Sequence, residues 1–203
     1  MTLEPGLEAA FRYTVTEADT AAAVARGAEL IWGAALPDAD GSGRHGGAEL
    51  LVLCTNTMHR VADQIAAAVE IPFVHIADTT ADAVRAAGLA TVGLLATAYT
   101  MEQDFYVGRL ERTHGLAVVV PDAEDRRLVH EVIYNELCLG IVKEDSRQAY
   151  RRVIGGLVER GAEGILLGCT EIDLLIGPQD APVPVFDTTR LHAERAVDLA
   201  LAT

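Results

Sequence analysis

The chain has 203 residues, of which 50% are hydrophobic and only 5% aromatic, and its formal net charge is −14. This length suits one large or two small α/β domains, and the acidic balance argues against nucleic acids and anionic membranes as partners. There is no apolar stretch of membrane-spanning length and no basic start followed by an apolar segment, so we expect a cytoplasmic protein. The three cysteines include no CxxC pair and do not predict a disulfide framework.

Short apolar runs alternate with longer amphipathic segments along the chain. Before residue 50 the pattern predicts an edge strand over 10–15, helices over 16–26 and 29–36, and a Gly-rich loop over 37–47. The strands predicted after that are 50–53, 73–76, 91–97, 116–120, 165–167 and 183–186. The corresponding helices are 58–69, 78–87, 101–113, 122–139, 144–160 and 191–201. This alternation is typical of parallel sheets with right-handed crossovers.

The first strand after the Gly-rich loop is predicted to end on Cys54, within the run Leu-Leu-Val-Leu-Cys-Thr-Asn-Thr-Met-His of residues 50–59. Open α/β sheets bind ligands at the carboxyl ends of their strands. The dipole and free amides of the helix predicted over 58–69 would favour a thiolate over a thiol at Cys54. We therefore expect this cysteine to be reactive.

The stretch around Cys54 has an echo later in the chain. Residues 47–55 match residues 161–170, where a second strand ends on Cys169-Thr170, and residues 71–80 match residues 183–189. Such a duplication would place two cysteines on facing edges of two similar domains, across one cleft.

The predicted fold is therefore α/β, with two similar three-layer domains of mainly parallel sheet, related by a pseudo-twofold axis, and an active site in the cleft between them. The first domain is expected over residues 1–90 together with about 190–203. The second is expected over residues 91–189.

Two thiols that face each other across a cleft suit a reaction in which one removes a proton from a carbon and the other delivers a proton to the opposite face. Cysteine can be tuned for such acid–base work. Asn56, Thr57 and Thr170, with backbone amides, could grip a substrate carboxylate, although helix capping also explains these residue types. The alternative for both Cys54 and Cys169 is a buried small hydrophobe.

Other polar residues near these motifs have less certain roles. His59 is expected to be solvated, or satisfied by a backbone carbonyl, rather than catalytic. His192 could orient the second thiol, through Cys169 or Glu171, or simply pack. Glu171 could bind a substrate ammonium or be a helix-start charge. Cys138 lies in an apolar segment and is expected to be structural.

Several other chemistries lack their residues. Pyridoxal phosphate needs a Schiff-base lysine, and the only lysine, Lys143, lies in a polar helix start. There is no HExxH, Walker A or GxSxG motif, and the histidines lack metal-ligand spacing. The GxGxxG at residues 41–46 precedes a strand instead of following one, so it predicts a loop. We expect neither a cofactor nor a metal.

Four motifs together resemble the aspartate/glutamate racemase family, which is independent of pyridoxal phosphate. Cys-Thr-Asn-Thr-Met-His at 54–59 and Gly-Cys-Thr-Glu-Ile at 168–172 are similar to its two catalytic motifs. Residues 100–106 and 186–193 match the branch of broad-specificity amino-acid racemases. The likeness is close from residue 48 to the C-terminus and weaker over 13–47.

The resemblance implies a two-domain homodimer that racemises a small amino acid such as aspartate, glutamate or homoserine. It implies that Cys54 and Cys169 are the two acid/base residues. The candidate substrate-binding side chains are Asn56, Thr57, Thr97, Thr100, Thr170, Glu171 and His192.

The chain departs from the family pattern in three places. Nothing matches the opening strand and its Gly-Gly-Met-Ser-like loop, and residues 37–47 form a Gly/Asp-rich loop where members carry a helix. Ala96 and Ala98 stand where this branch tends to have Gly and Arg around Thr97. The missing strand predicts a weakened first half, early or two-step melting, dependence on self-association, and slow or no turnover.

Two other functions therefore stand beside racemisation. One is a non-catalytic amino-acid-binding or degenerate homologue. The other is a decarboxylase or cis–trans isomerase of a dicarboxylic acid. Decarboxylase-like relatives keep only one of the two cysteines, and this chain keeps both, which favours racemisation.

Overall fold

The computed structural model describes residues 50–202, and the chain divides into two units. The described part of the first unit is 61–72, which contains helix α3, Ala62–Ala68. The second unit comprises 50–60 and the chain from residue 73 onward. The elements predicted before residue 50, and the consequences drawn from a missing first strand, lie outside the described residues. The predicted domain boundaries stay a prediction.

The second unit is built on parallel sheet. Its larger sheet has four strands in the order β4-β3-β5-β6, and every neighbouring pair is parallel. A separate parallel pair consists of β1 and β2. The strands are β1 Leu51–Val52, β2 Phe73–Val74, β3 Thr91–Ala96, β4 Ala117–Val119, β5 Gly164–Gly168 and β6 Val185–Asp187. The predicted α/β fold with mainly parallel sheet is confirmed.

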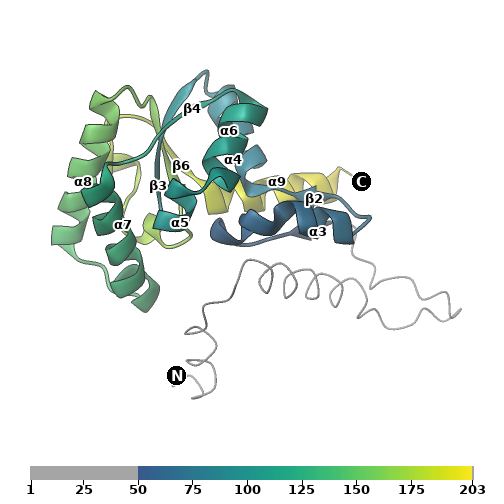
Figure 1. Cartoon of the computed structure of the whole chain (residues 1–203), viewed down its shortest axis with the longest axis horizontal. Coiled ribbons are helices and arrows are strands. Elements are labelled where there is room, and N and C mark those ends of the chain that lie inside the picture. Colours follow the sequence, from purple (N-terminus) through teal and green to yellow (C-terminus); the bar gives the residue numbers. More distant parts are fainter. Residues whose placement is uncertain (1–49, 203) are drawn as a thin grey trace, which may run out of the picture. The chain divides into compact units, whose positions relative to one another are not determined.

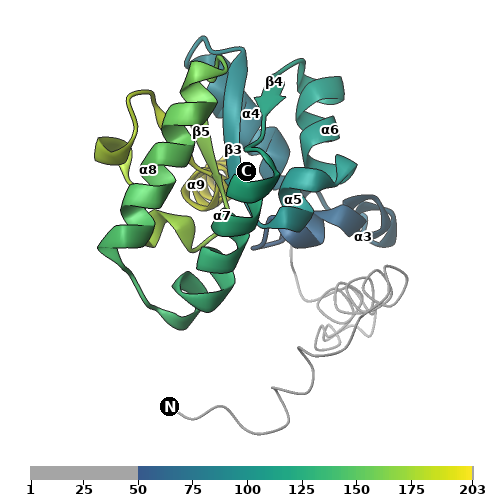
Figure 2. The same cartoon turned by 60° about the vertical axis from the view of Figure 1, so that its left-hand side comes forward.

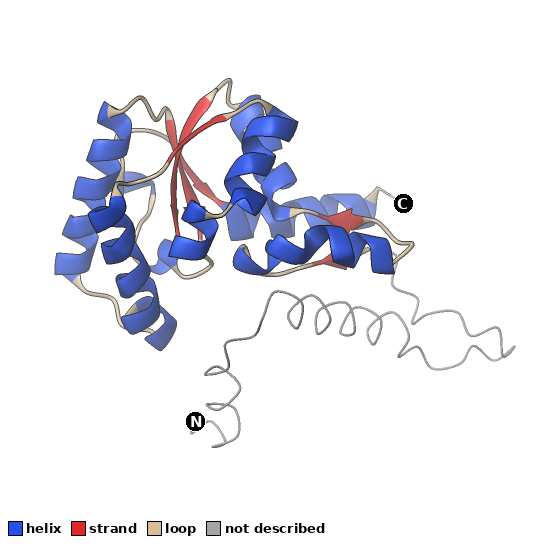
Figure 3. Ribbon diagram, viewed as in Figure 1, coloured by secondary structure: helices blue, strands red, loops and turns tan. Residues whose placement is uncertain are grey.

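Helices cover both faces of the four-stranded sheet, with α7 and α8 on one side and α4 and α6 on the other (Figure 1; strands in red in Figure 3). In the turned view of Figure 2, α8 and α6 again lie on opposite sides of the strands. The α-helices of this unit are α4 Ile76–Ala86, α5 Ala98–Glu102, α6 Asp104–His114, α7 Ala123–Asn135, α8 Glu144–Glu159 and α9 Thr188–Leu201. The 3₁₀ turns are η1 Thr57–Val61, η2 Leu137–Leu139, η3 Ile172–Leu174 and η4 Pro178–Asp180.

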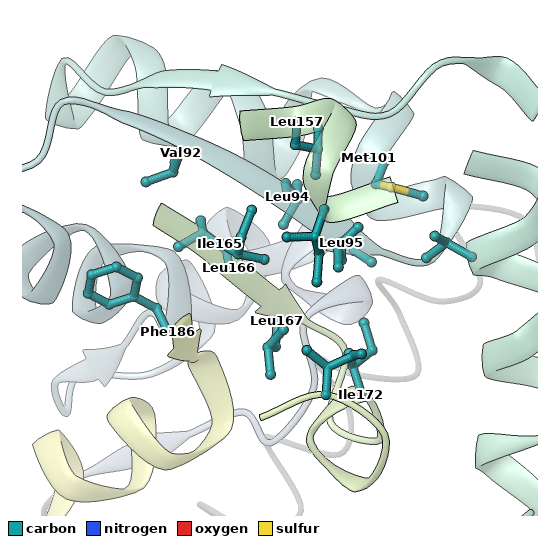
Figure 4. Packing of buried hydrophobic residues seen from close by; sticks show 14 of the residues in the cluster. Val92, Leu94, Leu95, Met101, Leu157, Ile165, Leu166, Leu167, Ile172 and Phe186 are labelled. Carbon is teal, nitrogen blue, oxygen red and sulfur yellow. The ribbon is translucent and has the colours of Figure 1, made fainter. Parts of the chain in front are cut away.

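The core of this unit lies along the central strands β3 and β5. All five residues of β5 are buried, as is every residue of β3 after Thr91. Strands covered on both faces read as continuous apolar runs, which is why these two were visible in the sequence. Figure 4 shows the apolar side chains that surround them, among them Leu94, Leu95, Ile165, Leu166, Leu157 of α8 and Phe186 of β6.

Three predicted helices are each divided in the structure. Residues 58–69 form η1 and then α3, and 122–139 form α7 and then η2. Residues 101–113 fall into α5 and α6, because Gln103 is extended at φ −94° and ψ 149°. The apolar period runs through these breaks, so it gives no sign of them. The end of α4 is as predicted, with Gly88 at φ 74° just beyond it.

Candidate active site

Neighbouring strands of the large sheet deliver polar residues to one edge. Ala96, the last residue of β3, pairs with Gly168, the last residue of β5. Thr97 and Cys169 therefore leave adjacent parallel strands side by side. Gly168 permits this close pairing, since a Cβ there would lie 2.8 Å from Leu94 Cδ1 and 3.0 Å from Ala96 Cβ.

The first cysteine lies at the centre of a tight backbone turn. The amide of Thr55 donates to the carbonyl of Leu53 at 2.8 Å, which is the hydrogen bond of a three-residue turn around Cys54. Cys54 is exposed, so its alternative interpretation as a buried hydrophobe is wrong. The element that follows is the short η1, so the long helix 58–69 invoked to favour a thiolate at Cys54 is absent.

Asn56 ties this turn to the strand of the second cysteine. Its Nδ2 donates to Thr188 Oγ1 at 3.1 Å, and Thr188 Oγ1 donates to the carbonyl of Leu167 at 2.8 Å. Asn56 and Thr188 are both buried. Leu167 stands two residues before Cys169, so these two bonds connect the two cysteine motifs.

A cluster of three hydroxyls, the threonine cluster of Thr57, Thr97 and Thr100, connects the first cysteine motif to the end of β3. Thr57 Oγ1 lies 3.2 Å from Thr97 Oγ1 and 3.1 Å from Thr100 Oγ1, and the last two are 3.3 Å apart. Thr100 is fully buried, whereas Thr57 is partly exposed. Only Thr57 of the three thus has an open side, and the other two hold its hydroxyl.

Cys169 is partly buried and donates its Sγ hydrogen to Glu171 Oε2 at 2.9 Å. Burial, followed by the hydrogen bond and negative charge of Glu171, raises the pKa of the Cys169 thiol. The thiol is therefore the stable form here. The thiolate expectation concerned Cys54, whereas burial and the Glu171 carboxylate both act against a thiolate at Cys169.

The remaining predicted side chains occupy different surroundings. Thr170 is partly exposed, and its hydroxyl has no hydrogen-bond partner among residues 50–202. His192 is buried and its Nε2 donates to the carbonyl of Val74 at 2.8 Å. Within the described part of the chain His192 has no hydrogen bond to Cys169 or Glu171, and its contact with substrate stays a prediction.

The structure corrects or completes three further interpretations. Cys138 is exposed on η2 rather than packed in a helix, and burial together with the charge of Glu171 raises its pKa. His59 is satisfied by a backbone carbonyl, as predicted, because its Nδ1 lies 2.6 Å from Thr55 O. Thr188 was overlooked as a site residue, although its place directly after β6 was a usable signal.

The helices formed by residues 50–202 are all too short or too polar to span a bilayer. In the same residues no three His, Cys, Asp or Glu side chains come together as metal ligands would. The described site thus consists of two cysteines, a carboxylate, an amide and several hydroxyls.

The described site thus places two Cys-Thr motifs after strands of a parallel α/β scaffold. The chain belongs to the Asp/Glu/Hydantoin racemase family, whose model matches residues 6–196. The family predicted from the sequence is confirmed.

Solved structures agree with this assignment. A candidate Asp/Glu racemase from Yersinia pestis is 50% identical, with a TM-score of 0.77, over 93% of this chain and 82% of that one. An aspartate racemase homologue from Pyrococcus horikoshii OT3 is 31% identical, with a TM-score of 0.77, over 94% of this chain and 78% of that one. The glutamate racemase of Francisella tularensis, solved with D-glutamate, shares the fold at 14% identity and a TM-score of 0.66, over 99% and 68%.

Proposed function

We propose that this chain racemises a small α-amino acid, such as aspartate, glutamate or homoserine, without a cofactor, with Cys54 and Cys169 acting on opposite faces of Cα. Membership of the racemase family supports amino-acid racemisation in general. The observation that carries the finer proposal is the hydrogen-bonded connection between the two cysteine motifs through Asn56 and Thr188. Beside it, the threonine cluster ties the first motif to the end of β3, the strand that pairs with the strand of Cys169.

In the proposed step one sulfur gains a proton and the other loses one, so the total number of protons on the two cysteines is unchanged. One thiolate takes the Cα proton and becomes a thiol, while the other thiol gives its proton to the opposite face and becomes a thiolate. Burial and Glu171 favour Cys169 as the group that starts as the thiol. In the direction that begins with Cys169 as the thiol, Cys54 removes the Cα proton, and the roles exchange for the other enantiomer.

The carbanion formed at Cα requires its carboxylate to be held by fixed donors. Thr57 is suited to this role because Thr97 and Thr100 fix its hydroxyl, and Thr170 offers a hydroxyl that is unpaired among residues 50–202. In this proposal Thr97 and Thr100 act through Thr57. The Glu171 carboxylate would attract the substrate ammonium.

The test is incubation of the protein with each enantiomer of a panel of amino acids in D₂O. For at least one amino acid we expect deuterium at Cα, measured by NMR, together with formation of the opposite enantiomer, measured by chiral chromatography. No exchange with any member of the panel would overturn the proposal.

Two further measurements separate the other functions. Calorimetric binding of an amino acid without isotope exchange would indicate a binding protein. Release of CO₂ from malonates without racemisation would indicate a decarboxylase.

A further inference from the structure

We propose that His59 is a positioning residue for Cys54: its ring fixes the carbonyl of Thr55, and with it the turn that presents the cysteine. The importance of Cys54 in turnover rests on the proposed function. The positioning itself can be tested without turnover, through the reactivity of the thiol.

The hydrogen bonds of the ring define a single tautomer. The amide of Ile76 donates to His59 Nε2 at 3.2 Å, and an amide can only donate, so Nε2 carries no proton. The proton is therefore on Nδ1, which donates to Thr55 O at 2.6 Å. A neutral ring satisfies both bonds, and a protonated ring would lose the bond from Ile76.

The surroundings keep the ring neutral and fixed. His59 is 2% exposed, and burial lowers its pKa to about 4, although the bond to Thr55 acts in the opposite direction. Its centroid lies 4.4 Å from that of His75, 5.5 Å from that of Phe73 and 5.9 Å from that of His192. These three histidines, called the histidine cluster below, are all buried.

The cluster is fastened to regular secondary structure. His75 Nδ1 accepts from the amide of Ala77 in the first turn of α4, and His192 Nε2 donates to the carbonyl of Val74 in β2. His59 itself is bonded to Ile76, the first residue of α4. The Thr55 carbonyl is thus held by a strand and a helix start, which define a site more closely than loops do.

Fixing Thr55 also fixes Cys54, because they share a peptide unit. The amide of Thr55 bonds to Leu53 O, and its carbonyl bonds to His59. With both groups engaged, the peptide units that follow Cys54 cannot rotate freely. A displacement of about 1 Å in a reacting group can cost on the order of 100-fold in rate.

Two other roles for His59 find no support. Both ring nitrogens are already engaged with backbone groups, and neither contacts Cys54, so His59 is not placed as its base. Across residues 50–202 no group of His, Cys, Asp and Glu side chains is arranged as metal ligands would be, and the histidine cluster is no exception.

The test compares His59→Asn with His59→Gln. The amide nitrogen of Asn can replace Nδ1 as donor to Thr55, whereas the amide oxygen of Gln can replace Nε2 as acceptor from Ile76. The rate of Cys54 alkylation by iodoacetamide is measured by peptide mass spectrometry, and isotope exchange in D₂O is measured beside it. Urea unfolding corrects both for the folded fraction.

We expect His59→Asn to keep the wild-type alkylation rate of Cys54, and His59→Gln to change it by about threefold or more and to lower exchange by about 100-fold. His130→Asn is the matched control, since His130 accepts from the amide of Ala98 and packs against Tyr99 and Tyr134, outside the histidine cluster. Equal behaviour of the two His59 variants at equal folded fraction would overturn the proposal. If the wild type exchanges no amino acid, the proposed function fails, but the alkylation rates still decide the positioning role.

Discussion

The two cysteine motifs follow the same plan and differ in the second residue after the cysteine. At the first motif this residue is Asn56, whose side chain points away to Thr188. At the second it is Glu171, whose carboxylate accepts the hydrogen of Cys169. Cys54 is exposed, and Cys169 is partly buried as a thiol. A duplication supplies two alike thiols, but a two-base reaction needs them in opposite protonation states, and this one position can supply that difference.

The supports beneath the two motifs differ as well. His75 directly follows β2 and caps α4, whereas Asp187 ends β6 and caps α9 through the amides of Thr189 and Arg190. The Asp-Thr-Thr that ends each matched stretch lies at a helix start in both halves, but Asp78 is in the first turn of α4 whereas Asp187 is the cap of α9. The first half therefore uses buried histidines where the second uses a partly buried carboxylate.

The largest effect is expected from removing either thiol. Because both acid and base are needed, Cys54→Ser and Cys169→Ser should each lower racemisation by about 10³-fold or more. Cys138→Ser is the control for loss of a cysteine outside the two motifs, with an expected change of less than about twofold. Chiral chromatography of the product measures all three, and substantial activity in either motif variant would contradict the two-base mechanism.

The next largest effect is expected from acid, through the histidine cluster of the first half. Burial lowers the pKa of His59 to about 4 and of His75 to about 3, from 6.5 in an unfolded chain. Their contribution to stability is complete above pH 6.5 and is lost as the pH falls toward 4. Over that range each histidine is protonated in the unfolded state but stays neutral in the folded state. The free energy of unfolding therefore falls by up to roughly 1.4 kcal/mol per pH unit for each histidine.

Urea midpoints at pH 7.5, 6 and 5 test this prediction at constant ionic strength. His59→Asn should show a shallower decline, because one titrating ring is gone. Asp78 does not interfere: burial would raise its pKa, but bonds from Arg109 and His114 hold the pKa at about 2. Its contribution is therefore lost only below pH 3.8. A midpoint that does not change between pH 7.5 and 5 would contradict the prediction.

A smaller effect on stability is expected where strands β3 and β5 approach each other closely, at Gly168. Gly168→Ala places a methyl group 2.8 Å from Leu94 Cδ1 and 3.3 Å from the Leu95 carbonyl, which should cost about 1–3 kcal/mol of stability. Gly155→Ala in α8 is the same substitution with open space around it, and should stabilise by about 0.5–1 kcal/mol. Urea unfolding measures both, and equal effects would contradict the close approach of β3 and β5.

Features set by neighbouring residues could be predicted from the sequence, whereas contacts between distant residues could not. The strand ending at Gly168 and the polar residues that follow it were predicted, because an apolar run and its end are local signals. Parallel pairing then brings Thr97 and Cys169 together without further information. The bond from Asn56 to Thr188 joins residues 132 positions apart, and no spacing rule foretells it.

The protonation states were the least predictable part. The bond of His59 to Thr55 spans only four residues, yet its tautomer is fixed by Ile76, which arrives through tertiary packing. Glu171 stands two residues from Cys169, but this spacing does not say whether its carboxylate turns toward the sulfur or toward solvent; in the structure it accepts the sulfur's hydrogen. Sequence spacing shows which charged groups can lie near each other, but burial and tertiary hydrogen bonds together set their pKa values.

The smallest effect is expected from Glu171→Gln, which removes the charge that distinguishes the two motifs. Burial remains, so the pKa of Cys169 should fall without reaching its ordinary range, and more thiolate should be present at pH 8. Alkylation of Cys169 should then become several-fold faster, while that of Cys54 stays the same. Glu163→Gln is the matched control, since that carboxylate bonds the amides of Ala90 and Thr91 instead.

Alkylation is the appropriate measurement because turnover cannot separate the two cysteines. The equilibrium constant of a racemisation is one, so kcat/KM must be equal for the two enantiomers whatever happens to one thiol. Thiol reactivity, read peptide by peptide, has no such constraint. If Glu171→Gln leaves Cys169 as slow as in the Glu163→Gln protein, the carboxylate does not set its protonation, and burial alone makes the two motifs different.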